Sequence, residues 1–154
     1  MKNTKQQLII EQVDKKLKAF ESLKENKIPT NGWVKAVRTA LKMSLRQLGS
    51  RMNFSPQNIR QLENREIAGT ISLNTLRDVA NAMDMQLVYG FVSKHESLEQ
   101  MIEKRAAALA TEIVMRTNNT MTLEDQQNSE LRIEKAIAQK TAEIKHEMPK
   151  YLWD

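Results

Sequence analysis

The sequence predicts a mainly α-helical protein with one short β-strand, and three observations lead to this fold class. Apolar residues recur at three- and four-residue spacing through most of the 154 residues, which is the pattern of amphipathic helices. Two short helical segments lie between residues 44 and 65, with only a few turn-forming residues between them. Residues 86–92 (QLVYGFV) alternate with a period of two and are rich in β-branched and aromatic residues, which indicates a strand.

Residues 44–65 (SLRQLGSRMNFSPQNIRQLENR) are predicted to form two helices joined by a tight turn. Ser55 can cap the second helix, and Pro56 loses no hydrogen bond at a first helical position. Asn53 suits the reversal between the helices because Asn tolerates a left-handed backbone better than most residues. The apolar residues expected to face inward share one side of each helix: Leu45, Leu48 and Met52 in the first, Ile59 and Leu62 in the second.

The outer face of the second helix is rich in amide and guanidinium groups, which can make paired hydrogen bonds to base edges in a DNA major groove. We therefore expect base contacts from Gln57, Asn58, Gln61 and Arg60, with Gln to adenine as the simplest pairing. Contacts to phosphates that fix the register are expected from seven residues: Arg46, Arg51, Ser55, Asn64, Arg65, Lys42 and Arg38. Glu63 is expected to cap or pair within the domain.

Residues 41–64 resemble the helix-turn-helix of the phage Cro and repressor proteins, the Xre-type regulators. Four features carry this resemblance: LKMS at 41–44, Leu48, the pair Ser55 and Ile59, and LEN at 62–64. Gly49 and Asn53 stand where that family often has Ala and Gly. The resemblance implies a lambda-repressor-like helix-turn-helix fold and double-stranded DNA as the partner.

A longer resemblance, over residues 32–92, is to the helix-turn-helix family called mobile mystery protein A. The segments GWVKAVRTAL, SLRQL, SLNTLRDVANAM and QLVYGFV carry it. That family tends to be encoded beside a Fic-domain protein. The resemblance implies an autorepressor of an operon that includes a Fic-type protein, in a toxin–antitoxin arrangement.

Composition argues against catalysis and supports a nucleic-acid partner. The chain has no cysteine and only four glycines, so a cysteine nucleophile, a disulfide framework and a Gly-rich phosphate loop are all excluded. His95 and His146 fall on different expected elements and form no metal-binding pair. We therefore expect no enzyme activity, cofactor or metal site. Residues 31–92 carry eight Lys and Arg against four Asp and Glu, which favours an anionic partner, although a solvated helical surface has the same charge.

Three regions are expected along the chain. Residues 1–31 form an amphipathic helix over 4–23 followed by a linker, residues 32–92 form the helix-turn-helix domain, and residues 93–154 form a C-terminal helical arm. The first helix has an apolar stripe of Ile9, Val13, Leu17 and Phe20 beside several lysines, so it either packs on protein or binds a membrane surface. Interspersed acidic residues favour packing on protein. No apolar run approaches the ~20 residues of a membrane span, and we expect a cytoplasmic protein without a membrane partner.

Further helices complete the expected domain and arm. One covers Trp33–Leu41 and buries Trp33 or Val34, Val37 and Leu41, and another follows the Ser72 cap with Leu73, Leu76, Val79, Ala80 and Met83 inward. The arm begins with a capping-box-like start at Ser97 and breaks near residues 117–120. Its last helix runs from about Thr122 or Ser129 to Met148. This helical pair either folds back on the domain or binds a second copy or a toxin.

Two functions follow from these observations. The first is a sequence-specific transcriptional regulator, a homodimeric repressor that reads half-sites about 34 Å apart and is joined through the strand at 86–92 or the C-terminal helices. The second is an antitoxin-like inhibitor that binds a Fic protein directly. Fic proteins are restrained by a helix bearing Ser/Thr-x-x-x-Glu-Gly/Asn, and residues 120–125 (TMTLED) approach this motif but depart from it at Asp125.

Overall fold

The computed structural model describes the backbone of residues 2–118 and 126–154, which contain helices but no strand. The chain divides into two compact units. Ser22–Gly90 forms the central unit, and the chain on either side of it, up to Glu21 and from Phe91, forms the flanking unit. Residues 119–125 lie outside the described part, and with them the near-match at 120–125 and the expected helix start at Thr122.

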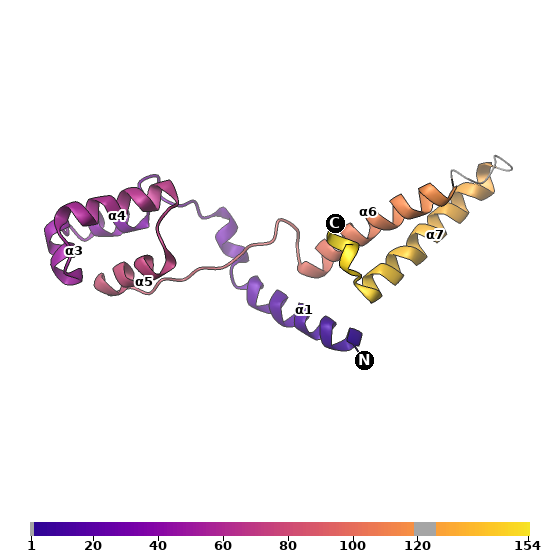
Figure 1. Cartoon of the computed structure of the whole chain (residues 1–154), viewed down its shortest axis with the longest axis horizontal. Helices are drawn as coiled ribbons and strands as arrows, with labels where there is room; N and C mark the ends of the chain where they lie inside the picture. The colour runs from indigo at the N-terminus through magenta and orange to yellow at the C-terminus, as the bar shows by residue number, and fades with distance from the viewer. Residues whose placement is uncertain (1, 119–125) are drawn as a thin grey trace. The chain divides into compact units, whose positions relative to one another are not determined.

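The central unit is a small helical bundle (Figure 1), and its buried apolar residues form one core. Within it α3 packs against both α4 and α5, and α2 packs against α4. The helices have these bounds: α2 Trp33–Ala40, α3 Leu45–Met52, α4 Pro56–Ala68 and α5 Leu73–Ala82, after a 3₁₀ helix at Glu21–Glu25. The core consists of Val34, Leu48, Ile59, Leu62, Val79 and Met83.

Local capping explains where the helices of the central unit begin and end. Ser44, Ser55 and Ser72 each accept a hydrogen bond from the backbone N–H three residues later, at 3.0–3.1 Å, which satisfies a donor that the helix leaves unpaired. Asn53 ends α3 with φ 59°, and Gly69 ends α4 with φ 75°. The predicted roles of Ser55, Pro56, Asn53 and Ser72 are therefore confirmed.

Some of the predicted core positions in this unit are wrong. Of the two alternatives predicted at the start of α2, Val34 is the buried residue, and Trp33 is 48% exposed. Leu41 is exposed because α2 ends at Ala40 and the chain then turns through Lys42 at φ 53°. Leu73 is exposed at the first position of α5. Amphipathic spacing finds the buried face of a helix, but the positions at its ends depend on how the chain enters and leaves.

The expected strand is not seen in a single chain. Residues 86–92 form neither helix nor strand. A strand is defined by hydrogen bonds to a neighbouring strand. The described part of one chain contains no other strand with which residues 86–92 could pair.

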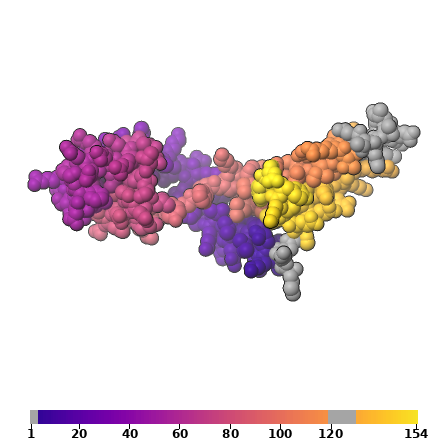
Figure 2. All heavy atoms as spheres, in the orientation of Figure 1, coloured from indigo at the N-terminus to yellow at the C-terminus, as the bar shows by residue number. Residues whose placement is uncertain are grey.

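The flanking unit is a helical hairpin, α6 Leu98–Asn118 with α7 Gln126–Glu147, against which α1 Lys2–Lys18 packs. Helices α6 and α7 pack against each other (orange and yellow in Figure 2). Ala106 and Ala110 are completely buried, which lets the two helices approach closely. Arg105 holds the final 3₁₀ helix, Lys150–Trp153, because its Nε donates to the Leu152 carbonyl at 2.5 Å. The C-terminal helices thus have a core of their own.

The face with which α1 packs differs from the predicted stripe. Ile10 packs on the core of the flanking unit, while Ile9 and Val13 remain 43% and 37% exposed. One turn after Ile10, Asp14 accepts the backbone N–H of Leu98 at 2.8 Å. Asp14 thereby caps α6 and complements the positive end of its dipole. The helix also ends at Lys18, earlier than predicted, and no described helix is both long and apolar enough to cross a membrane.

Candidate nucleic-acid interface

Helix α4 presents a single amide-rich stripe to solvent. Ile59, Leu62 and Glu63 are 0–4% exposed and fix which side of the helix faces inward. At 100° per residue, Gln57, Gln61 and Asn64 lie on the opposite side, and all three are exposed. The exposed side chains of Asn58, Arg60 and Arg65 lie to either side of this stripe. The structure therefore brings the four predicted base-contacting residues onto one accessible surface.

Glu63 is paired within the domain, as predicted. One carboxylate oxygen accepts from Arg38 Nε at 2.5 Å and the other from Arg38 Nη2 at 3.3 Å. Arg38 Nη1 donates to the Met43 carbonyl at 2.9 Å. The side chains of Arg38 and Glu63 are only 13% and 5% exposed. Arg38 is thus engaged inside the central unit, and we leave it out of the residues that could reach a phosphate.

Glu66 is a structural residue that the sequence analysis missed. Its carboxylate accepts the backbone N–H of Trp33 at 2.7 Å and of Val34 at 2.8 Å, and so caps α2 from α4. Gly32, the residue before α2, has no side chain that could cap the helix. The sequence does contain a signal for this role, because helical spacing places Glu63 and Glu66 on the same face as Ile59 and Leu62. Two carboxylates on the buried face of a helix require partners.

The outward charges of α3 and α4 are all positive. The acidic residues of these two helices are Glu63 and Glu66, and both carboxylates point inward to the partners described above. Arg46, Arg60 and Arg65 are exposed and make no side-chain hydrogen bond or ion pair within the described residues. The surface of this helix pair therefore combines amides and guanidinium groups without a free carboxylate.

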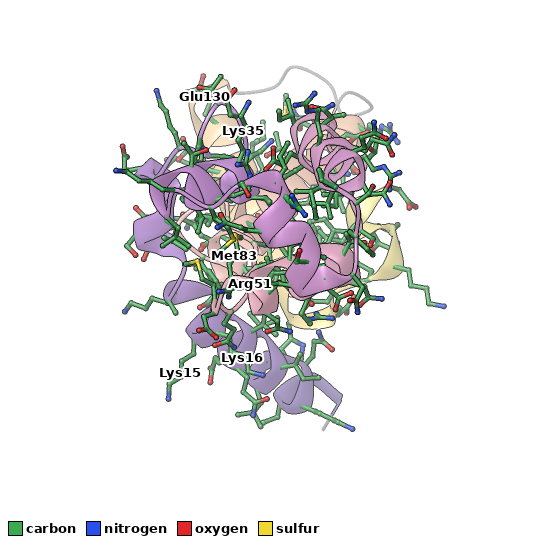
Figure 3. The ribbon with its side chains drawn as sticks, turned by 90° about the vertical axis from the view of Figure 1, so that its left-hand side faces the viewer. Lys15, Lys16, Lys35, Arg51, Met83 and Glu130 are labelled. Atoms are coloured by element: carbon green, nitrogen blue, oxygen red, sulfur yellow. The ribbon has the colours of Figure 1, made fainter. Side chains whose placement is uncertain are left out.

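The other predicted phosphate-contacting residues differ in whether their side chains already have a hydrogen-bond partner. Lys42 and Asn64 are exposed and unpaired among the described residues. Arg51 donates to the Ala82 carbonyl at 3.1 Å and lies beside Met83 at the end of α5 (Figure 3). The Ser55 oxygen accepts the Asn58 N–H at 3.1 Å, which leaves its hydroxyl hydrogen free to donate.

Close packing at Gly49 fixes the angle between α3 and α4. A Cβ atom added at Gly49 would overlap the Phe54 carbonyl oxygen. The Phe54 N–H in turn donates to the Gly49 carbonyl at 2.8 Å. The turn is thus held directly against α3, so the surface of α4 has a defined orientation.

Residues 34–89 match the family model described as helix-turn-helix. This stretch contains α3, α4, α5 and nearly all of α2, and it includes every residue of the amide-rich surface. The match supports the predicted Xre/Cro type for this part of the chain. No curated protein and no solved structure matches the sequence.

Proposed function

We propose that this chain is a sequence-specific DNA-binding transcriptional regulator that reads double-stranded DNA with α4. One observation carries the proposal: the exposed surface of the helix pair offers amides and guanidinium groups, while both of its carboxylates are used inside the domain. A phosphate backbone repels free carboxylates, and base edges pair well with amides and guanidinium groups. The protein acts by binding, in the cytoplasm, and we assign it no catalytic role.

Base readout falls to the residues of the outward stripe and its flanks. Gln57 and Gln61 are one helical turn apart, so they can meet successive bases in a major groove, each with a bidentate contact to adenine. Asn58 can pair in the same way from the flank. Arg60 reaches either a guanine or a phosphate. Pro56 has no N–H to donate at the start of the helix.

Phosphate contacts orient the domain on the duplex. Lys42 precedes α3, and Arg46 lies in the first turn of α3. Asn64 and Arg65 lie toward the end of α4. Arg51 and the Ser55 hydroxyl complete the set. Such contacts fix register and orientation but carry no sequence information.

Replacing Arg46 by alanine tests the phosphate assignment. Because its side chain has no partner among the described residues, the substitution leaves the fold unchanged. We expect a similar loss of affinity for all DNA sequences, and a plot of log affinity against log salt whose slope is shallower by about 1. Fluorescence anisotropy at several salt concentrations measures both. Arg132→Ala, an exposed arginine of α7, is the matched control, and an unaltered slope for Arg46→Ala would rule out the assigned phosphate contact.

We further propose that the regulator binds DNA as a two-fold dimer. One helix-turn-helix domain covers few base pairs, and two copies reading half-sites about 34 Å apart would combine their affinities. A nuclease footprint on the fragment upstream of the gene tests the proposal. We expect two protected half-sites one helical turn apart. Protection of a single half-site would contradict the dimer.

The resemblance to mobile mystery protein A leads us to propose autorepression of an operon that includes a Fic-type protein. The alternative, direct inhibition of that partner, would place the chain among antitoxins. The two are separated by adding the Fic-type protein to the regulator in the absence of DNA. A stable complex supports direct inhibition. Repression of the promoter without any such complex supports the regulator alone.

A further inference from the structure

An apolar groove of about 670 Å³ lies in the central unit. Segments 28–30 and 85–88 form part of its lining, together with the start of α2, the end of α4 and parts of α5. The lining of the groove includes none of the α4 residues that are proposed to contact bases. Glu66 is its only charged residue, and that carboxylate is already used by the N–H groups of Trp33 and Val34. The groove therefore suits an uncharged, apolar occupant.

Large apolar side chains around the groove are open to solvent. Ile28 is 71% exposed, Ile67 53% and Met85 49%, and Trp33 and Val88 are 48% and 65% exposed. These residues come from separate parts of the sequence and converge on one surface. Contiguous apolar surface of this kind marks an interaction site on a folded domain.

The backbone of the segment that borders the groove has no hydrogen-bond partner in the described part of the chain. Residues 86–92 form neither helix nor strand and make no hydrogen bond within the described residues. Their side chains include Tyr89 and Phe91, which are 61% and 82% exposed. No charged residue occurs from Met85 to Val92. Free backbone donors and acceptors next to β-branched and aromatic side chains are what an additional strand pairs with.

We propose that a second copy of this chain covers the groove by pairing its residues 86–92 antiparallel with the same residues here, in a register centred on Tyr89. In this register Leu87 lies opposite Phe91 of the second copy, and Phe91 opposite its Leu87. Side chains two residues apart share a face of a strand, so Leu87, Tyr89 and Phe91 lie together. Leu87 lines the groove, and Phe91 of the second copy lies opposite Leu87. Phe91 is the most exposed of the described large apolar residues, and in this register it lies at the groove of the other copy.

The groove supplies the apolar surface that stabilises this pairing of strands. A two-stranded ribbon alone is at best marginally stable in water, and it needs an apolar surface to pack on. An uncharged segment meets its own copy without electrostatic repulsion, which favours self-pairing over a charged partner. The inference deepens the proposed function, because it supplies the two-fold axis that relates two α4 helices. It is tested without DNA, so it can fail or succeed separately from DNA binding.

Sedimentation equilibrium of the full chain over a range of concentrations tests the proposal. The mass of one chain is 17.8 kDa, and we expect the wild-type protein to have twice this mass. The double variant Tyr89→Lys/Phe91→Lys should raise the dimer dissociation constant by roughly 30-fold or more, the effect of losing central aromatic contacts. Ile28→Asp, about 60 residues away in the sequence, should weaken the dimer as well because it lines the groove.

Leu73→Lys is the matched control, since Leu73 is 45% exposed in the same unit but does not line the groove. It should leave the dimer intact, and circular dichroism should show that all variants are folded. A wild-type protein that is monomeric at every accessible concentration overturns the proposal. So does a Tyr89→Lys/Phe91→Lys variant that dimerises as well as Leu73→Lys. An Ile28→Asp variant with wild-type dimerisation overturns the role of the groove. A stable dimer without DNA preference would sustain this inference and refute the proposed function.

Discussion

Replacing Glu63 by alanine should lower the free energy of unfolding of the central unit by about 3–5 kcal/mol, because it leaves the charge of Arg38 buried without its partner. The side chains of both residues are largely shielded from water. Their ion pair also joins α2 to α4 across 25 residues of sequence. Hydrogen exchange of peptides from residues 45–68 in the full chain measures the loss within this unit alone.

Glu143→Ala is the matched control, because Glu143 pairs with Lys140 at 3.2 Å on an exposed surface. Glu143 lies in the flanking unit, so its effect is measured by hydrogen exchange of peptides from α7. Exposed pairs of that kind contribute little to stability, and the control should leave it nearly unchanged. The double variant Arg38→Met/Glu63→Leu should recover much of the loss, since it leaves neither charge unpaired. A Glu63→Ala protein as stable as the control would show that the ion pair does not hold α2 against α4.

The double variant Gln57→Ala/Gln61→Ala should lose specific DNA affinity by about 1–3 kcal/mol for each bidentate contact removed, while its affinity for random DNA changes little. Both side chains are exposed and unpaired among the described residues, and alanine is a good helix former, so the fold should be unaffected. Selection of preferred sequences from a random duplex pool measures the change in readout.

Gln139→Ala, an exposed glutamine of α7, controls for loss of a surface amide elsewhere in the chain. Its selected sequences should equal those of the wild type. If the Gln57→Ala/Gln61→Ala protein also selects the wild-type sequence, these two glutamines do not read bases, and readout would have to come from Asn58 or Arg60.

The parts of the domain that the sequence predicted depend on local interactions. The cap at Ser55 and the left-handed turn at Asn53 involve residues within a few positions of each other. The inward positions Leu48, Ile59 and Leu62 follow from helical spacing, because only one face of each short helix can be apolar. The outward amides of α4 follow from the same spacing. This is why the exposed amide-rich face of α4 could be predicted from the sequence.

The features that were missed depend on contacts between distant residues. The sequence predicts that Glu63 caps or pairs within the domain but could not identify Arg38 as its partner, and it places Arg38 among the residues expected to contact phosphates. The Glu66 cap of α2 spans 33 residues. In α1, several apolar residues surround the helix, and only the hydrogen bond from Leu98 to Asp14 and the packing of Ile10 distinguish the face that is used. Strand pairing at 86–92 requires a second segment that the described part of one chain lacks.

The most direct test of sequence-specific DNA binding is a titration of the wild-type protein with a labelled fragment from upstream of its gene, against random duplex competitor at several salt concentrations. We predict binding at least ~10³-fold tighter than to random DNA, with an affinity that falls steeply as salt rises. Equal affinity for the upstream fragment and the random duplex would contradict the account, and would leave the surface of α4 without a role in sequence recognition.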